Sequence, residues 1–220
     1  MLRAVLFDLD GTLVDSEPLA IEALLAAAHR HDHGLTADVV MKHPGAHFAA
    51  MLMAELRVTE EEAEAVCATY DEIFLEEAVP RIAALPGANE LVAQLARAGT
   101  SLGIVTNKPL PLVEAVLATL GWDVHFQVTV AHGMAAENKP SPAPAFLALE
   151  RLGRGATETV FIGDTAGDMA CGRTAGLRAV IGVGGTSTAE VLFAAGATHF
   201  CRSLREAGEL IAPWVRSSPS

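Results

Sequence analysis

The chain has 220 residues, of which 51% are hydrophobic and 19% charged; this composition indicates a well-packed globular protein of one large or two modest domains and excludes a disordered chain. Its 15 basic and 27 acidic side chains give a formal net charge of -12, which argues against nucleic acid or an anionic membrane surface as a partner. No stretch approaches the roughly 18 uninterrupted apolar residues of a membrane span.

The first predicted element is a buried strand over residues 4–9 whose end carries two carboxylates, Asp8 and Asp10. Gly11 and the following threonine end the apolar run, so both acids should lie at the carboxyl end of a parallel strand, where open α/β sheets bind their ligands. Residues two apart in an extended chain point to the same side, so the two acids can face one substrate. Two close carboxylates repel each other, which favours a bound divalent cation, with Asp8 as nucleophile and Asp10 as general acid and base.

Two aspartates with this spacing, taken without their flanking residues, more often form a helix cap or a turn than a catalytic site, so this alternative stays open.

Residues 15–84 differ from the rest of the chain, because they show helical periodicity, many acids and no runs of β-branched residues. The pattern predicts an all-α cap domain inserted after the first strand, with an α/β catalytic core over residues 1–14 and 85–220. The two crossings between these domains would act as hinges, so that the cap can exclude water and select the substrate.

Two helices are predicted within the insertion. The first opens at Pro18 and ends at about His33, before Gly34. The second begins after Thr59, which forms a capping box with a glutamate three residues later, and continues to about Val79.

Two histidines of the insertion, His43 and His47, flank a Pro-Gly step and are candidates for contact with the substrate. Lys42 precedes them. The alternative is a loop and a helix start whose histidines only cover the surface.

The remainder of the chain alternates between strand and helix patterns. Helices are expected near 87–98, 109–120, 142–152, 166–175, 188–195 and 203–215, and strands near 101–106, 125–130, 158–163, 178–183 and 198–201. This alternation predicts an α/β fold with a Rossmann-like, mostly parallel sheet that carries helices on both faces.

Two segments of this part have the residues of an anion site. The strand over 101–106 ends in Thr106 and Asn107, and a hydroxyl with free backbone N–H groups at a helix start binds anions. Lys139 lies in a proline-rich segment that stiffens the backbone beside its charge, which suits a phosphate.

The strand over 158–163 leads into Asp164, with Asp168 four residues later. Two further carboxylates at a strand end are the oxygen ligands that a hard divalent cation prefers.

Together these segments resemble the haloacid dehalogenase superfamily, and specifically its phosphatases with a helical cap, such as the phosphoglycolate phosphatase-like group. The matching pieces are Asp8-Leu-Asp-Gly-Thr12, Thr106 with Asn107, Lys139, and Gly163-Asp-Thr-Ala-Gly-Asp168. The resemblance implies a phosphoric monoester hydrolase that uses Mg²⁺ and an aspartyl-phosphate intermediate on a small phosphate ester.

The resemblance also implies a role for each matching residue. Asp8 would be the nucleophile and a metal ligand, and Asp10 the acid and base whose backbone carbonyl touches the metal. Thr106 and Lys139 would hold the phosphoryl oxygens, with Gly11 and Asn107 beside them. Asp164 would ligate Mg²⁺, and Asp168 would support that ligand or the lysine.

Alternative functions stay open in the sequence. A sugar phosphomutase of the β-phosphoglucomutase type uses the same two acids, and an Asp-phosphorylated signalling module also combines Asp, Thr, Lys and Mg²⁺ on a parallel sheet. The substrate, whether phosphoglycolate or a sugar phosphate, and the choice between monomer and homodimer are not fixed by these motifs.

Three cysteines, Cys67, Cys171 and Cys201, lack metal-ligand spacing and are expected to be reduced. No basic segment followed by an apolar stretch and a cleavage site opens the chain, so a cytoplasmic location is expected.

Overall fold

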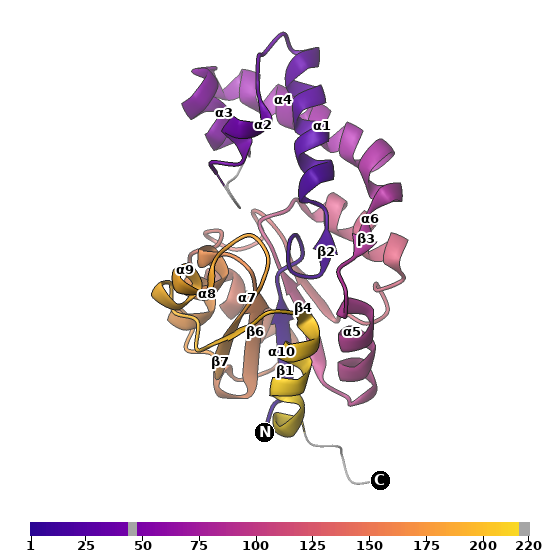
Figure 1. Ribbon diagram of the computed structural model, residues 1–220, viewed down its shortest axis with the longest axis vertical. Helices are drawn as coiled ribbons and strands as arrows, with labels where there is room; N and C mark the ends of the chain where they lie inside the picture. The colour runs from indigo at the N-terminus through magenta and orange to yellow at the C-terminus, as the bar shows by residue number, and fades with distance from the viewer. Residues whose placement is uncertain (44–47, 216–220) are drawn as a thin grey trace. The chain divides into compact units, whose positions relative to one another are not determined.

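The computed structural model describes residues 1–43 and 48–215. The chain forms two compact units, one made of Met1–Asp15 with the chain from Ala84 onward and the other of Ser16–Ala83 (Figure 1).

The first unit is built on a six-stranded sheet with the order β5-β4-β1-β6-β7-β8. Its strands are β1 (Ala4–Phe7), β4 (Ser101–Val105), β5 (Val128–Val130), β6 (Thr159–Gly163), β7 (Ala179–Val183) and β8 (His199–Cys201). All pairings between neighbouring strands are parallel. The predicted α/β fold with a parallel sheet is therefore confirmed, and the observed strands lie within the predicted ranges.

The strand order places a topological switch point between β1 and β6. From β1 the sheet continues along the chain to β4 and β5 on one side, and from β6 it continues to β7 and β8 on the other. Loops that leave two adjacent strands in opposite directions open a crevice at their carboxyl ends, where ligands bind in such sheets. This crevice is the position at which Asp8 and Asp164 emerge.

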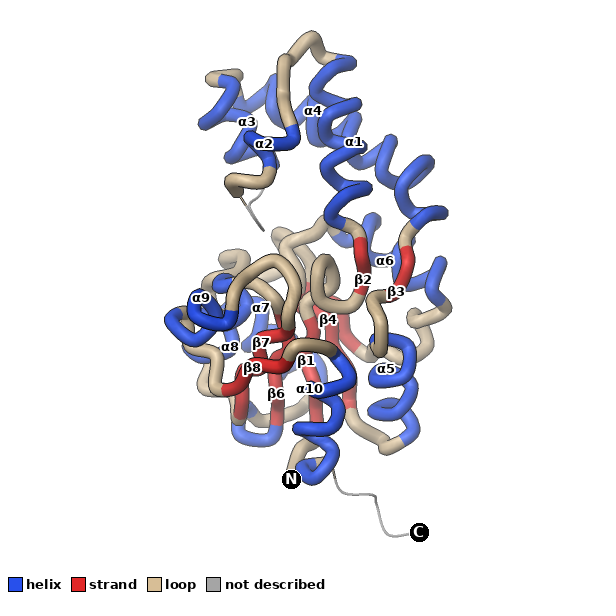
Figure 2. The backbone as a smooth tube through the Cα atoms, in the orientation of Figure 1, coloured by secondary structure: helices blue, strands red, loops and turns tan. Residues whose placement is uncertain are grey.

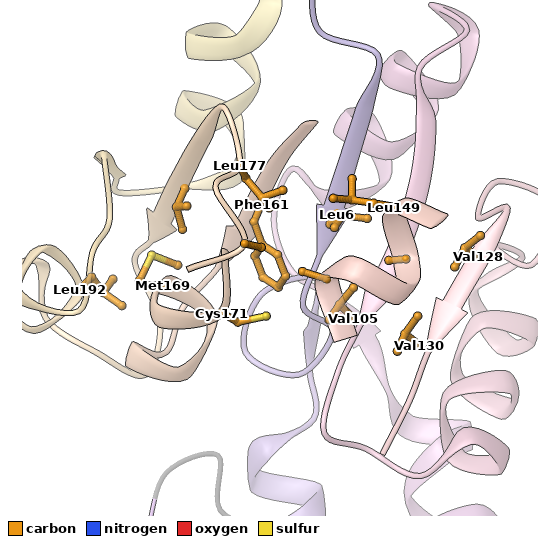
Figure 3. Packing of buried hydrophobic residues seen from close by; sticks show 14 residues of the cluster. Leu6, Val105, Val128, Val130, Leu149, Phe161, Met169, Cys171, Leu177 and Leu192 are labelled. Carbon is orange, nitrogen blue, oxygen red and sulfur yellow. The ribbon is translucent and has the colours of Figure 1, made fainter. Parts of the chain in front are cut away.

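Helices cover both faces of this sheet (Figure 2). They are α5 (Ala88–Arg97), α6 (Leu110–Leu120), α7 (Ala143–Leu152), α8 (Ala166–Thr174), α9 (Ala189–Ala194) and α10 (Leu204–Ile211). Helices α7 and α8 pack on the face that carries Leu6 and Phe161, and Figure 3 shows this core. Helices α5 and α10 pack against each other. Because both faces are covered, the strands are apolar throughout rather than alternating.

The second unit is helical. Its helices are α1 (Glu17–Arg30), α2 (Ala37–Val40), α3 (Phe48–Leu56) and α4 (Glu60–Ile73), followed by a π-helical turn (Phe74–Ala78) and a 3-10 turn (Val79–Arg81). Helix α4 packs against both α1 and α3, and the ring of Tyr70 contacts the rings of Phe48 and Phe74.

The capping box predicted at Thr59 is present, since its hydroxyl accepts a hydrogen bond from the Glu62 N–H while Glu62 accepts one from the Thr59 N–H. The first helix ends earlier than expected, at Arg30 rather than near the glycine at 34. Asp32, with φ of 59°, adopts the left-handed conformation that commonly ends a helix, and aspartate tolerates this region better than most residues.

A separate two-stranded sheet, β2 (Val14–Asp15) with β3 (Ala83–Ala84), was not predicted. Two residues per strand are too few to show a periodicity of two in the sequence. The two strands lie at the points where the chain passes from one unit to the other. Among the described residues, no helix is long and apolar enough to cross a membrane.

Phe161 offers a test of the core. Its ring is fully buried, so Phe161→Ala should lower the free energy of unfolding by about 3–5 kcal/mol. Phe193→Ala makes the same change at a position that is 51% exposed, and should change that energy by less than about 0.5 kcal/mol. Urea unfolding of both variants gives the comparison, and equal losses would contradict the packing described here.

Candidate active site

The site lies at the carboxyl edge of the sheet, where the central strands end together. Phe7, the last residue of β1, is in register with Ile104 of β4 and Ile162 of β6. Parallel strands in register deliver the residues that follow them to one edge, which brings Asp8, Thr106 and Asp164 to the same side of the sheet.

A buried lysine joins two of the predicted site carboxylates. Lys139 Nζ lies 2.8 Å from Asp8 Oδ1 and donates a hydrogen bond of 2.6 Å to Asp168 Oδ1. All three side chains are at most 9% exposed. Among the described residues, Asp8 Oδ1 accepts no hydrogen bond of regular geometry, so its contact with Lys139 is an ion pair alone. The oxygen therefore keeps a lone pair that a further cation can use.

Asp168 is fixed through its second oxygen. Oδ2 accepts hydrogen bonds from the N–H and the hydroxyl of Thr165, at 3.0 and 2.6 Å, in a capping box at the start of α8. Gly163 makes room for this carboxylate, because a Cβ there would lie 2.6 Å from the Asp168 Cγ. Both oxygens of Asp168 are thus engaged, one by Thr165 and one by Lys139.

Asp164 is held by two threonines from distant segments. The Thr12 hydroxyl donates to Oδ1 at 2.7 Å, and the Thr186 N–H donates to Oδ2 at 3.1 Å. Gly11 approaches the same carboxylate so closely that a Cβ on it would lie 2.5 Å from Asp164 Oδ2. The Gly-Thr step after the two N-terminal acids therefore shapes the pocket around Asp164.

The three carboxylates form a cluster that suits a metal ion. Asp8, Asp164 and Asp168 are all buried, and each offers an oxygen within 4.8 Å of the others. Burial and the neighbouring Asp168 and Asp164 raise the pKa of Asp8 to about 8. Burial and Asp168 also raise the pKa of Asp164. These shifts show that negative charge is crowded here, and an all-oxygen set of this kind fits a hard divalent cation.

Lys139 carries the compensating charge. Burial alone would lower the pKa of Lys139, but the carboxylates of Asp168 and Asp8 raise it above its ordinary value. The lysine therefore stays protonated in a site from which water is largely excluded.

Asn107 clamps the backbone of Lys139. Its side-chain Oδ1 accepts from the Lys139 N–H at 3.1 Å, and its Nδ2 donates to the Lys139 carbonyl at 3.2 Å. Thr106, buried at the end of β4, accepts a hydrogen bond from the Lys108 N–H through its hydroxyl. The Asn107 side chain thus positions Lys139, and its predicted contact with phosphate stays a prediction.

Asp10 is separate from the three-carboxylate cluster. Its Oδ1 accepts a hydrogen bond of 3.0 Å from Lys108 Nζ, and its side chain is 31% exposed. The predicted contact of its backbone carbonyl with a metal stays a prediction.

Two residues of the insertion, His43 and His47, are predicted to contact the substrate. His43 lies in that unit, where its Nε2 is 2.8 Å from Glu55 Oε1. His47 lies outside the described residues. Their assignment to the substrate stays a prediction.

Sequence reasoning missed several contributors to the site, among them Thr165, Thr186 and the side-chain role of Thr12. Thr165 has a recognisable signal, since a threonine three residues before an acid at a helix start is a capping box. Thr186 follows two glycines directly after β7, which marks a close backbone approach without naming its partner.

The comparisons with known proteins agree with this geometry. The family described as haloacid dehalogenase-like hydrolase matches residues 5–182. A phosphoglycolate phosphatase of Xanthomonas campestris is 34% identical over 202 residues, which cover 83% of this chain and 84% of that protein. An N-acetylmuramic acid 6-phosphate phosphatase of Pseudomonas aeruginosa is 34% identical over 182 residues, which cover 80% of each chain.

The fold has solved counterparts as well. The crystal structure of a hydrolase from Pseudomonas syringae superposes with a TM-score of 0.84 at 24% identity, covering 97% of this chain and 100% of that one. As its motifs predicted, the chain belongs to the haloacid dehalogenase-like hydrolase family.

Proposed function

We propose that this protein is a Mg²⁺-dependent phosphatase that hydrolyses a small phosphorylated metabolite through an aspartyl-phosphate intermediate on Asp8. The observation that carries this proposal is the placement of Asp8 against the buried Lys139, within a cluster that also contains Asp164 and Asp168. The relatives named as phosphatases support it.

The reaction uses two acids in sequence. A carboxylate oxygen of Asp8 attacks phosphorus, and the bond from phosphorus to the ester oxygen breaks while Asp10 gives that oxygen a proton. Asp10 then takes a proton from the water that attacks the phosphorylated Asp8. Inorganic phosphate leaves and the Asp8 carboxylate is regenerated.

Positioning and charge supply most of the rate in phosphoryl transfer. Lys139 and Thr106 hold the phosphoryl oxygens, with the backbone of Gly11 and Asn107 beside them. Asn107 keeps Lys139 in place through the two hydrogen bonds to its backbone.

Asp8 and Asp164 would hold Mg²⁺ directly, together with the backbone carbonyl of Asp10. Asp168 would act indirectly by holding Lys139, because its two oxygens already accept hydrogen bonds from Lys139 and Thr165. When bound, Mg²⁺ neutralises negative charge between the nucleophile and the incoming phosphate.

We propose a small substrate of the phosphoglycolate or sugar-phosphate kind. Relatives named as phosphatases of phosphoglycolate and of N-acetylmuramic acid 6-phosphate support this choice of candidate substrates. A panel of such esters, scored by kcat/KM, identifies the substrate. If no member of the panel releases phosphate in the presence of Mg²⁺, the proposed function is wrong.

Asp8→Asn tests the nucleophile. The amide has nearly the same shape but is a poor nucleophile, so kcat should fall by at least about 1,000-fold on the best ester of the panel. The matched control is Asp123→Asn, the same change at an exposed aspartate, which should keep wild-type kcat. Inorganic phosphate release is the measurement, and substantial turnover by Asp8→Asn would contradict the assignment.

Gly11→Ala tests the pocket around Asp164. Its new Cβ would displace Asp164 Oδ2, so the affinity for Mg²⁺ should fall by about 10- to 100-fold, as for other changes that disturb a metal ligand from outside. Gly99→Ala is the control, since Gly99 has nearly the same φ, +72° against +74°, with no atom near the added Cβ.

Both variants place an alanine at nearly the same positive φ, so Gly99→Ala controls for that backbone strain, and only Gly11→Ala, whose added Cβ meets Asp164, should bind Mg²⁺ more weakly. Calorimetric titration with Mg²⁺ measures the affinity directly. Equal affinities in the two variants would remove Asp164 from the metal site.

A further inference from the structure

A second buried lysine lies at the site, and the motifs give it no role. Lys108 Nζ donates a 3.0 Å hydrogen bond to Asp10 Oδ1, and the Lys108 side chain is 5% exposed. The chain has three lysines, and two of them are therefore buried against the two acids that follow β1.

The backbone of Lys108 is held at both ends. Its N–H donates to the Thr106 hydroxyl at 3.2 Å, and its carbonyl accepts from the His132 N–H at 3.0 Å. A buried lysine side chain with a fixed backbone loses less conformational entropy when it forms an ion pair than an exposed lysine does. It also restricts the position of its partner more tightly.

The two acids differ in how they are held. Asp8 is buried and enclosed by Lys139 and the other carboxylates, whereas the Asp10 side chain is 31% exposed. A partly exposed carboxylate samples several rotamers unless another group orients it. The ammonium of Lys108 is a fixed point of opposite charge that favours one orientation.

We propose that Lys108 is a positioning residue for Asp10, which it orients for proton transfer to the leaving oxygen and from the attacking water. This inference rests on the proposed function, in which Asp10 is the general acid and base. In both steps the proton moves only between Asp10, the leaving oxygen and water.

General acid catalysis matters most when the leaving oxygen is strongly basic, because such an oxygen cannot depart without a proton. A misplaced Asp10 should therefore slow alkyl phosphates far more than nitrophenyl phosphate. A lysine that only stabilised the fold or attracted the anionic substrate would affect all esters alike.

Lys108→Met removes the charge and keeps the unbranched shape and nearly the length of the side chain. With this variant, kcat should fall by about 10- to 100-fold for an alkyl phosphate and by less than about 3-fold for 4-nitrophenyl phosphate, because a misplaced acid loses only part of the roughly 10²- to 10⁴-fold that general acid–base catalysis contributes. The measurement is kcat and KM over a series of phosphate esters with increasingly basic leaving groups, at saturating Mg²⁺.

Three comparisons complete the test. Lys108→Arg keeps the charge and should restore part of the rate for alkyl esters, which also covers the case in which the Met variant fails to fold. In an Asp10→Ala background, Lys108→Met should add no further dependence on the leaving group. Arg205→Met, at an exposed side chain, should keep the wild-type profile.

The positioning role would be overturned if Lys108→Met slowed every ester equally. It would also be overturned if Lys108→Met still slowed alkyl phosphates more than nitrophenyl phosphate in the Asp10→Ala background. In either case, hydrolysis by the wild-type protein would leave the proposed function unaffected. Lack of hydrolysis by the wild-type protein would instead reject the proposed function and this inference with it.

Discussion

Repulsion between buried carboxylates is the constraint on which the rest of the site depends. Asp8, Asp164 and Asp168 present oxygens within 4.8 Å of one another, and at an effective dielectric constant of about 20 each pair of charges costs roughly 3 kcal/mol or more. The sum is comparable to the whole stability of a domain, about 5–15 kcal/mol. Lys139 offsets part of it through two short contacts. When all three acids are ionised, one lysine leaves a net negative charge, which is the physical reason to expect a cation.

Strand geometry and local hydrogen bonds hold this electrostatically unfavourable cluster in place. Asp8 and Asp164 follow adjacent strands at the switch point of the sheet, where backbone geometry alone brings them together. The other groups are held by local devices: a capping box fixes Asp168, and an amide clamp fixes Lys139. Because each charged group is restrained by an interaction of its own, little reorganisation is needed when charge moves, which is what electrostatic catalysis requires.

The sequence predicted the strands of the six-stranded sheet, the helices that cover it and the acids Asp8, Asp164 and Asp168 at its carboxyl edge, because apolar runs that end in acids mark strand ends independently of distant contacts. It failed at features that depend on tertiary distances. The Lys108–Asp10 pair joins residues 98 positions apart, and Thr186 reaches Asp164 through a backbone N–H that any residue carries. Asn107 has an amide suited to phosphate, and only the structure shows that it binds the backbone of Lys139. The predicted end of α1 was too late, because Asp32 adopts the left-handed conformation that was expected at Gly34.

If Asp8 is the nucleophile, it becomes phosphorylated during turnover. Rapid acid quenching of the enzyme with Mg²⁺ and a good ester, followed by peptide mass spectrometry, detects this intermediate. Phosphate is expected on the peptide that contains Asp8, appearing before inorganic phosphate and decaying as substrate is exhausted. Phosphate on another residue, or steady turnover with no phosphorylated peptide at any time, would contradict it.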